Sequence, residues 1–293
     1  MSSAKIVWES ASNFLEVFMF SSIAIETSSY CNRRCLFCPN SVSPRSKSEE
    51  FMPMDLIEKV LGDLAAIGYR KRVELYIYNE PLRDPRLCDI IQMVRNLLPK
   101  SCIMISTNGD YLTTDLLEEL YNAGLNQMQV NIYSRPKSGW TYAKGAWLLR
   151  TEPLGIEMDG PIYQYIRPAR RTMAVSYKWD IDAFRNTRGP FAISNRAGNI
   201  PDFLPPRQIN KMCTKPFRFL NIAWNGEVLL CCNDYYNEVR IGNVADKPVL
   251  DLWRSPIFMR YRLDLMEKIR RLPVCNRCDF NGGVYQWNVK LED

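Results

Sequence analysis

Apolar strand patterns alternate with helical patterns through the first half of this chain, and that alternation restricts the possible folds most strongly. The expected strands cover residues 22–27, 72–81, 102–109 and 127–134. The expected helices cover residues 53–68, 86–98 and 113–124. Apolar residues recur at helical spacing within each expected helix. The helix at 113–124 begins with a Thr cap and ends at Gly124. We therefore expect an α/β protein with a parallel sheet, open or curled into a barrel.

Three cysteines follow the first expected strand, in the loop YCNRRCLFCPN. Cys31, Cys35 and Cys38 have the spacing C-x3-C-x2-C. Three thiolates can hold three irons of a cubane 4Fe–4S cluster and leave the fourth iron open to an external ligand. A zinc site would usually need a fourth Cys or His nearby, and none follows in this loop. The loop lies at a strand carboxyl end, where such folds place their sites.

Cysteine and histidine usage limits the chemistry further. The 293 residues include ten cysteines and no histidine. Clustered cysteines favour metal binding in a reducing compartment, and the absence of histidine excludes Ser-His and Cys-His nucleophile pairs. No apolar run reaches the roughly 18 residues of a membrane span, and residues 14–25 are interrupted by Glu16 without a following cleavage site. We predict a soluble, cytoplasmic protein.

The regular pattern loosens between residues 135 and 204, where we expect one further strand at 170–179 and otherwise loops and short helices. Residues 134–215 contain 14 Lys and Arg against 6 Asp and Glu, whereas the whole chain carries +6. This excess indicates either a solvated basic face or a surface for an anionic ligand. Aromatic residues beside arginines there could also stack nucleobases, but no RNA-binding module is recognisable, so we do not expect nucleic acid to be the partner.

A second unit is expected from Pro205 onward. It begins with a β-hairpin that turns at Asn225-Gly226, a strong two-residue hairpin signal. A helical stretch follows and is interrupted at Pro256. The expected division is therefore an extension at 1–21, a partial barrel at 22–204 with its basic and aromatic loops at 135–204, and a small domain at 205–293.

Further cysteines gather in this second unit. Cys213, Cys231, Cys275 and Cys278 could close a four-thiolate site, and the C-x2-C pair is also common in structural zinc sites. The residues alone leave zinc and an iron–sulfur cluster open. Cys232 should point to the opposite side of its strand from Cys231. It is then either a core residue or a thiol that returns a hydrogen atom to a substrate radical.

The motif CNRRCLFC resembles the radical S-adenosylmethionine (SAM) superfamily. YNEP, STNG and QVNIYS resemble later motifs of that family, in the same order. The resemblance implies a partial (β/α)6 parallel barrel in which SAM chelates the open iron. It also implies that an external donor such as flavodoxin or ferredoxin supplies an electron, and that the 5′-deoxyadenosyl radical removes a hydrogen atom from the substrate.

The same resemblance implies a set of SAM contacts. Glu80 stands where the family contacts the SAM amino group, and Asn131 where it contacts the ribose or the carboxylate. Tyr78 and Asn79 replace two glycines of the family motif, which puts the backbone contacts there in doubt. The implied cofactor-binding residues are Phe37, Tyr78, Asn79, Glu80, Ser106, Asn108 and Asn131.

The C-terminal segments resemble the SPASM/twitch extension of that superfamily. The resemblance rests on Cys213, Gly226 and Cys231 with CCND and IGNV following, and on SNRAG at residues 194–198. No cysteine follows Cys278, as in the shorter twitch form. The resemblance thus implies one auxiliary 4Fe–4S cluster, held by Cys213, Cys231, Cys275 and Cys278.

Function follows from this resemblance, which extends to members of the 2-deoxy-scyllo-inosamine dehydrogenase and sugar epimerase types. It implies oxidation of a carbinol in a polar small molecule such as a sugar, cyclitol or nucleotide-linked compound, in natural-product or antibiotic biosynthesis. The excess of Lys and Arg over residues 134–215 favours an anionic substrate. Sugar epimerisation with Cys232 as hydrogen donor is one alternative. Peptide modification is another, disfavoured because only 21 residues precede the first strand. An electron carrier or sensor is a third, disfavoured because an open iron is a liability in a carrier.

Overall fold

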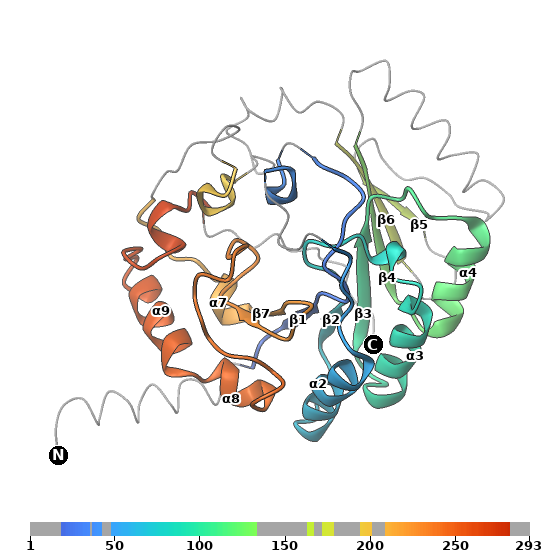
Figure 1. The fold of residues 1–293 in the computed structure, drawn as a ribbon, viewed down its shortest axis with the longest axis horizontal. Coiled ribbons are helices and arrows are strands. Elements are labelled where there is room, and N and C mark those ends of the chain that lie inside the picture. Colours follow the sequence, from blue (N-terminus) through green and yellow to red (C-terminus); the bar gives the residue numbers. More distant parts are fainter. Residues whose placement is uncertain are drawn as a thin grey trace.

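One mixed α/β sheet organises the protein (Figure 1). The computed structural model describes residues 19–35, 37–42, 48–133, 163–166, 172–178, 194–200 and 209–281. The strands are β1 (Ser22–Ile25), β2 (Arg72–Glu74), β3 (Cys102–Thr107), β4 (Gln127–Tyr133), β5 (Tyr163–Ile166), β6 (Thr172–Lys178), β7 (Phe219–Ile222) and β8 (Val228–Leu229). Their order in space is β5-β6-β4-β3-β2-β1-β7-β8. The strands from β6 to β7 in that order pair in parallel, and β5 and β8 add antiparallel edges. The expected parallel α/β fold is confirmed.

Three helices connect the first four strands and lie on one side of the sheet (Figure 1). They are α2 (Met54–Ala66), α3 (Leu87–Leu97) and α4 (Thr114–Ala123). The Thr113 hydroxyl accepts from the Leu116 backbone N–H and so caps α4, and Gly124 ends that helix at φ 118°. Both signals agree with the sequence pattern, because a hydroxyl satisfies a free helix N–H and glycine tolerates positive φ.

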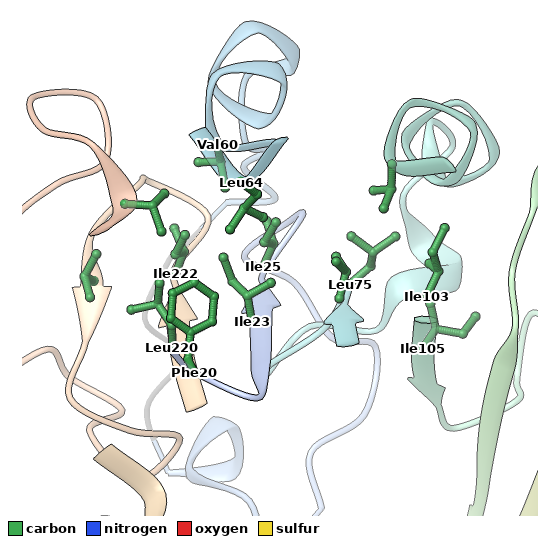
Figure 2. Close-up of a cluster of buried hydrophobic side chains, with 14 of the residues drawn as sticks. Phe20, Ile23, Ile25, Val60, Leu64, Leu75, Ile103, Ile105, Leu220 and Ile222 are labelled. Atoms are coloured by element: carbon green, nitrogen blue, oxygen red, sulfur yellow. The ribbon is translucent and has the colours of Figure 1, made fainter. Parts of the chain in front are cut away.

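Strand alternation separates an apolar face from a polar face. Figure 2 shows Ile23 and Ile25 of β1 pointing toward Val60 and Leu64 of α2, and all four side chains are fully buried. The intervening strand positions therefore face away from the helices. Their residues are mostly polar and include Glu26, Glu74, Ser106, Gln127, Gln129, Asn131 and Asn221. A polar inner face at the centre of a fold indicates a binding surface rather than a packing surface.

The predicted hairpin is present, and it belongs to the same sheet as the barrel strands. β7 pairs in parallel with β1, and β8 returns antiparallel to β7. The turn contains Gly226 at φ 83°, where an added Cβ would stand 2.5 Å from the Asn243 Oδ1. The helical stretch that follows divides into α8 (Val249–Trp253) and α9 (Pro256–Met266), as the proline at 256 predicts.

Two expectations about strands differ from the structure. β5 lies between residues 135 and 170, where only loops and short helices were expected. β2 covers three residues of the expected 72–81 strand. Most of residues 135–204, including the basic and aromatic cluster, lie outside the described residues. Within the described part of the chain, no helix has both the length and the apolar character needed to cross a bilayer.

Candidate functional site

The three-cysteine loop leaves β1 at the carboxyl edge of the sheet. Cys31, Cys35 and Cys38 are each half-buried, and the Cys38 backbone N–H donates to the Cys35 carbonyl over 2.8 Å. Burial raises the pKa of Cys31 to about 11, and the neighbouring Glu80 and Cys38 add to that rise. The loop thus brings Cys31 and Cys38 within electrostatic reach of each other and of Glu80. These thiols would release their protons on binding a metal, since iron is held by thiolates.

Glu80 joins three parts of this edge. One carboxylate oxygen accepts from the Leu82 N–H and the Thr107 hydroxyl, and the other accepts from the Asn108 N–H over 2.8 Å. The Glu80 N–H donates to the carbonyl of Tyr30, the residue before the first cysteine. The side chain is 2% exposed, and burial raises its pKa. A carboxylate offers about four acceptor positions, so one remains for a ligand amine.

Tyr78 and Asn79, which replace two glycines of the resembled motif, turn their side chains to the protein. The Tyr78 hydroxyl donates to the Cys232 carbonyl over 2.8 Å. The Asn79 side chain accepts from the Ile77 N–H and donates to the Thr27 hydroxyl. Tyr78 therefore ties the segment between β2 and Glu80 to the segment after β8 that carries Cys231.

The remaining predicted SAM contacts lie at the ends of β3 and β4 and in the cysteine loop. The Asn131 amide donates to the Ser106 hydroxyl over 2.8 Å, across neighbouring strands. The Asn108 amide donates to Asn32 of the cysteine loop over 2.8 Å. Phe37 is buried within that loop. The structure thus gathers all seven predicted contacts around one edge of the sheet, and their binding of SAM stays a prediction.

The four C-terminal cysteines also come together. Cys231 ends the hairpin, Cys213 precedes it, and Cys275 and Cys278 lie in the loop after α9. Burial raises the pKa of Cys275 to about 12, and Cys278 and Cys213 contribute to the rise. Burial also raises the pKa of Cys231 well above its usual value, with Cys275 and Cys213 again among the causes. Each of the four sulfurs therefore lies within electrostatic reach of others in the set.

Cys232 has a different environment from Cys231. The Lys215 ammonium donates to the Cys232 sulfur over 3.0 Å and lies 4.5 Å from the centre of the Phe280 ring. Burial alone would raise the pKa of Cys232, but Lys215 and Arg196 outweigh it and the pKa is lowered. Glu74 of the polar inner face acts on the same thiol. Cys232 therefore lies in a charged environment beside Lys215, and the expectation of an apolar core position does not fit this contact.

Arg196 was not singled out from the sequence, and it lies between the two cysteine groups. Its positive charge acts on both Cys38 and Cys232. Arg196, Ala197 and Gly198 have φ values of 51°, 56° and 75°. Consecutive left-handed residues are costly outside glycine and occur mainly where a site requires them. In the sequence, the segment SNRAG pointed to a site only through the family resemblance. The left-handed backbone at residues 196–198 could not be predicted from residue types, since only Gly198 favours that conformation.

The donor chemistry of both cysteine groups fits iron–sulfur clusters. A zinc ion holds its thiolates about 2.3 Å away, so four ligand sulfurs must crowd around one point. Among the residues that the structure describes, no group of three or more Cys, Asp or Glu side chains is close enough to hold one metal ion. Iron–sulfur clusters are held by Cys thiolates, and each of the two groups is made of cysteines alone.

Two family domains match this chain. The Radical SAM superfamily domain matches residues 25–139, and the SPASM iron–sulfur cluster-binding domain matches residues 213–279. These ranges contain the predicted loop cysteines and the predicted auxiliary cysteines, respectively. A radical SAM domain uses SAM and a 4Fe–4S cluster, and a SPASM domain adds an auxiliary iron–sulfur cluster, so these are the cofactors of this protein.

Similar proteins support the same assignment. The S-adenosyl-L-methionine-dependent 2-deoxy-scyllo-inosamine dehydrogenase of Niallia circulans is 26% identical over 262 residues, which cover 89% of this chain and 93% of the relative. The crystal structure of BtrN in complex with AdoMet and 2-DOIA has a TM-score of 0.66 at 26% identity, covering 89% of this chain and 94% of that one. Streptococcus suis SuiB bound to S-adenosylmethionine has a TM-score of 0.50 at 12% identity, covering 88% and 72%, and shares the fold. The chain is therefore a radical SAM oxidoreductase with a C-terminal SPASM-type iron–sulfur domain.

Proposed function

We propose that this enzyme oxidises a carbinol carbon of a polar small molecule, a sugar or cyclitol, in natural-product biosynthesis. In this proposal Cys31, Cys35 and Cys38 hold the SAM-binding cluster. A second cluster is held by the four C-terminal thiolates, Cys213, Cys231, Cys275 and Cys278. With these groups bound, the first cluster and SAM would supply the radical chemistry that removes one hydrogen atom. The second cluster would accept the electron left when the substrate also loses a proton, and together these losses would convert a carbinol to a ketone.

One observation carries this proposal: four thiols from three separate segments, three of them buried and one half-buried, lie within electrostatic reach of one another. A cluster with four protein ligands has no open iron, so electron transfer is its natural role. Cys232, the neighbour of Cys231, lies within electrostatic reach of Glu74 on the polar inner face of the sheet. A substrate lying there is close enough to hand over an electron.

The substrate would lie between the two cysteine groups, beside Arg196. That guanidinium reaches both Cys38 and Cys232 electrostatically, so it is placed to bind a polar group of a molecule held between them. The excess of Lys and Arg over residues 134–215 favours a substrate with an anionic group. The relative from Niallia circulans is named for an inosamine, which supports the cyclitol class.

Epimerisation with Cys232 as hydrogen donor is the second candidate. The electrostatic reach of Cys232 to Glu74 on the inner face favours epimerisation, but the contact of Cys232 with Lys215 argues against it. The Lys215 ammonium favours the thiolate, which has no hydrogen atom to give. Under the proposed dehydrogenation, Cys232→Ala keeps the oxidised product. An epimerase would lose its inverted product in this variant while still cleaving SAM.

Iron content and product analysis test the proposal together. The anaerobically reconstituted protein should hold about eight irons, as two 4Fe–4S clusters require. Cys231→Ala with Cys275→Ala should reduce this to about four while SAM cleavage with a chemical reductant or reduced flavodoxin continues. Cyclitols and sugars, with and without phosphate, should be screened for a product two hydrogens lighter. If the wild-type protein holds only about four irons, or yields a product of unchanged mass, the proposed oxidation is wrong.

A further inference from the structure

Asn233 contacts two of the four auxiliary cysteines at once. Its backbone N–H donates to the Cys231 sulfur over 3.4 Å. Its side-chain amide donates to the Cys278 sulfur over 3.5 Å, 45 residues further along the chain. The residue is 2% exposed, so water does not compete for these sulfurs from its side. One asparagine therefore supplies N–H dipoles to sulfurs from two different segments of the predicted ligand set.

The orientation of Asn233 is fixed from outside the ligand set. Its carbonyl accepts from the Asn199 amide over 2.9 Å, and Asn199 is itself buried. Asn199 follows the left-handed turn that contains Arg196. On the other side of that turn, the Asn195 amide donates to the Arg277 carbonyl over 2.8 Å, beside Cys278. The segment 195–199 thus holds both the strand end and the C-terminal loop, and it aims the Asn233 donors at the two sulfurs.

Hydrogen bonds to ligand sulfurs change the energetics of an iron–sulfur cluster. Reduction adds negative charge to the cluster and its thiolates, so an N–H dipole stabilises the reduced form more than the oxidised form. The reduction potential rises as a result. Burial strengthens the effect, because the local dielectric constant is low and solvent does not screen the dipoles.

We propose that Asn233 is a positioning residue that raises the reduction potential of the auxiliary cluster and so makes it a better acceptor of the substrate electron. This inference rests on the proposed function, because it needs Cys231 and Cys278 to be cluster ligands. It goes beyond that function by naming the residue that sets the driving force of the electron transfer. Asn233 itself touches neither SAM nor the substrate in this role.

A purely structural role for Asn233 would look different in experiment. Loss of a structural contact lowers cluster loading or thermal stability, but it leaves the potential of a fully loaded cluster unchanged. The measurement is therefore a redox titration of reconstituted holoenzyme followed by electron paramagnetic resonance. The signal that does not change when SAM is added reports the auxiliary cluster.

Asn233→Leu removes the side-chain donor at similar volume without adding charge, and it leaves the backbone N–H to Cys231 in place. We expect the midpoint potential of the auxiliary cluster to shift to a more negative value. Product formation should slow, while SAM cleavage without substrate stays at the wild-type rate. Asn243→Leu is the matched control, because this asparagine of the same unit bonds Asn225 and Ala245 and no sulfur. The midpoint potential of the auxiliary cluster in Asn243→Leu should equal that of the wild type.

Asn233→Asp is a second variant of nearly unchanged shape that also lacks the amide donor, and it should show the same direction of shift. Unchanged potentials in fully loaded Asn233→Leu and Asn233→Asp would overturn the inference and leave the two-cluster function standing. A wild-type protein with only about four irons would instead refute the proposed function itself. The two failures are thus distinguishable by iron content before any variant is titrated.

Discussion

Replacing Glu80 with Gln tests whether the carboxylate at the edge of the sheet binds SAM or only holds the strands together. Its oxygens accept from Leu82, Thr107 and Asn108, and one acceptor position remains. A charge-assisted hydrogen bond to a ligand ammonium is worth about 1.5–3 kcal/mol. Loss of that bond should weaken SAM binding by roughly 10- to 100-fold, since each 1.4 kcal/mol is about tenfold.

The same substitution also disturbs the protein. Gln would place an NH2 group against the Asn108 N–H if its oxygen keeps the contacts with Leu82 and Thr107, so one buried donor loses its acceptor. Such a buried, unsatisfied group costs about 1–3 kcal/mol of stability. Thr107→Val is the matched control, because it removes one donor to Glu80 and the acceptor of the Gly109 N–H while keeping the carboxylate charge.

Equilibrium dialysis of SAM against the reconstituted enzyme, together with thermal unfolding, separates the two effects. We expect both variants to lower the Tm and only Glu80→Gln to raise the Kd for SAM by tenfold or more. An unchanged Kd in Glu80→Gln would show that Glu80 is a structural residue. An equal loss of affinity in Thr107→Val would show that the strand ends, rather than the carboxylate, determine SAM binding.

Three further perturbations follow from contacts in the hairpin region. Gly226→Ala places a Cβ 2.5 Å from the Asn243 Oδ1 at a residue with positive φ. Urea unfolding should show that the free energy of unfolding falls by about 1–3 kcal/mol. An unchanged free energy of unfolding would mean that the turn relaxes to accept the new side chain. Tyr78→Phe removes the hydroxyl bond to the Cys232 carbonyl and should cost about 1 kcal/mol in the same assay, with a wild-type value arguing against that bond. Burial raises the pKa of Asp234 to about 6. The folded protein then holds this proton more tightly than the unfolded chain, so up to about 3 kcal/mol of stability present below pH 4 is lost as pH rises to about 6. Asp234→Asn should flatten that part of a Tm–pH profile, and an unchanged slope would refute the assignment.

Local patterns predicted most of the regular structure, because they state conditions that short segments satisfy by themselves. Thr113 caps the start of α4, and Gly124 ends that helix in the left-handed conformation. Gly226 forms the hairpin turn at positive φ. The parallel pairing of β7 with β1 was not predicted. It joins segments about 200 residues apart, and nothing in either segment specifies its neighbour.

The candidate site divides in the same way. Cysteine spacing identified the two thiol groups, and the family resemblance assigned the cluster ligands and the edge residues around Glu80. Lys215, Arg196 and Asn233 were missed as site residues, because their roles depend on which sulfur each one faces after folding. Lys215 lies two positions after Cys213, and that spacing predicts no function by itself. Its contact with the Cys232 sulfur, which identifies it as a site residue, is seen only in the fold.

The pairing of β1 with β7 also dictates the order in which the protein can assemble during synthesis. β1 is synthesised well before its second neighbour, β7, which starts at Phe219. Until then the main-chain N–H and C=O groups along one side of β1 have no sheet partner, and such an open edge can join strands of other chains. That edge of β1 is covered only once the hairpin has been made, so pairing with β7 is a late step in forming the sheet.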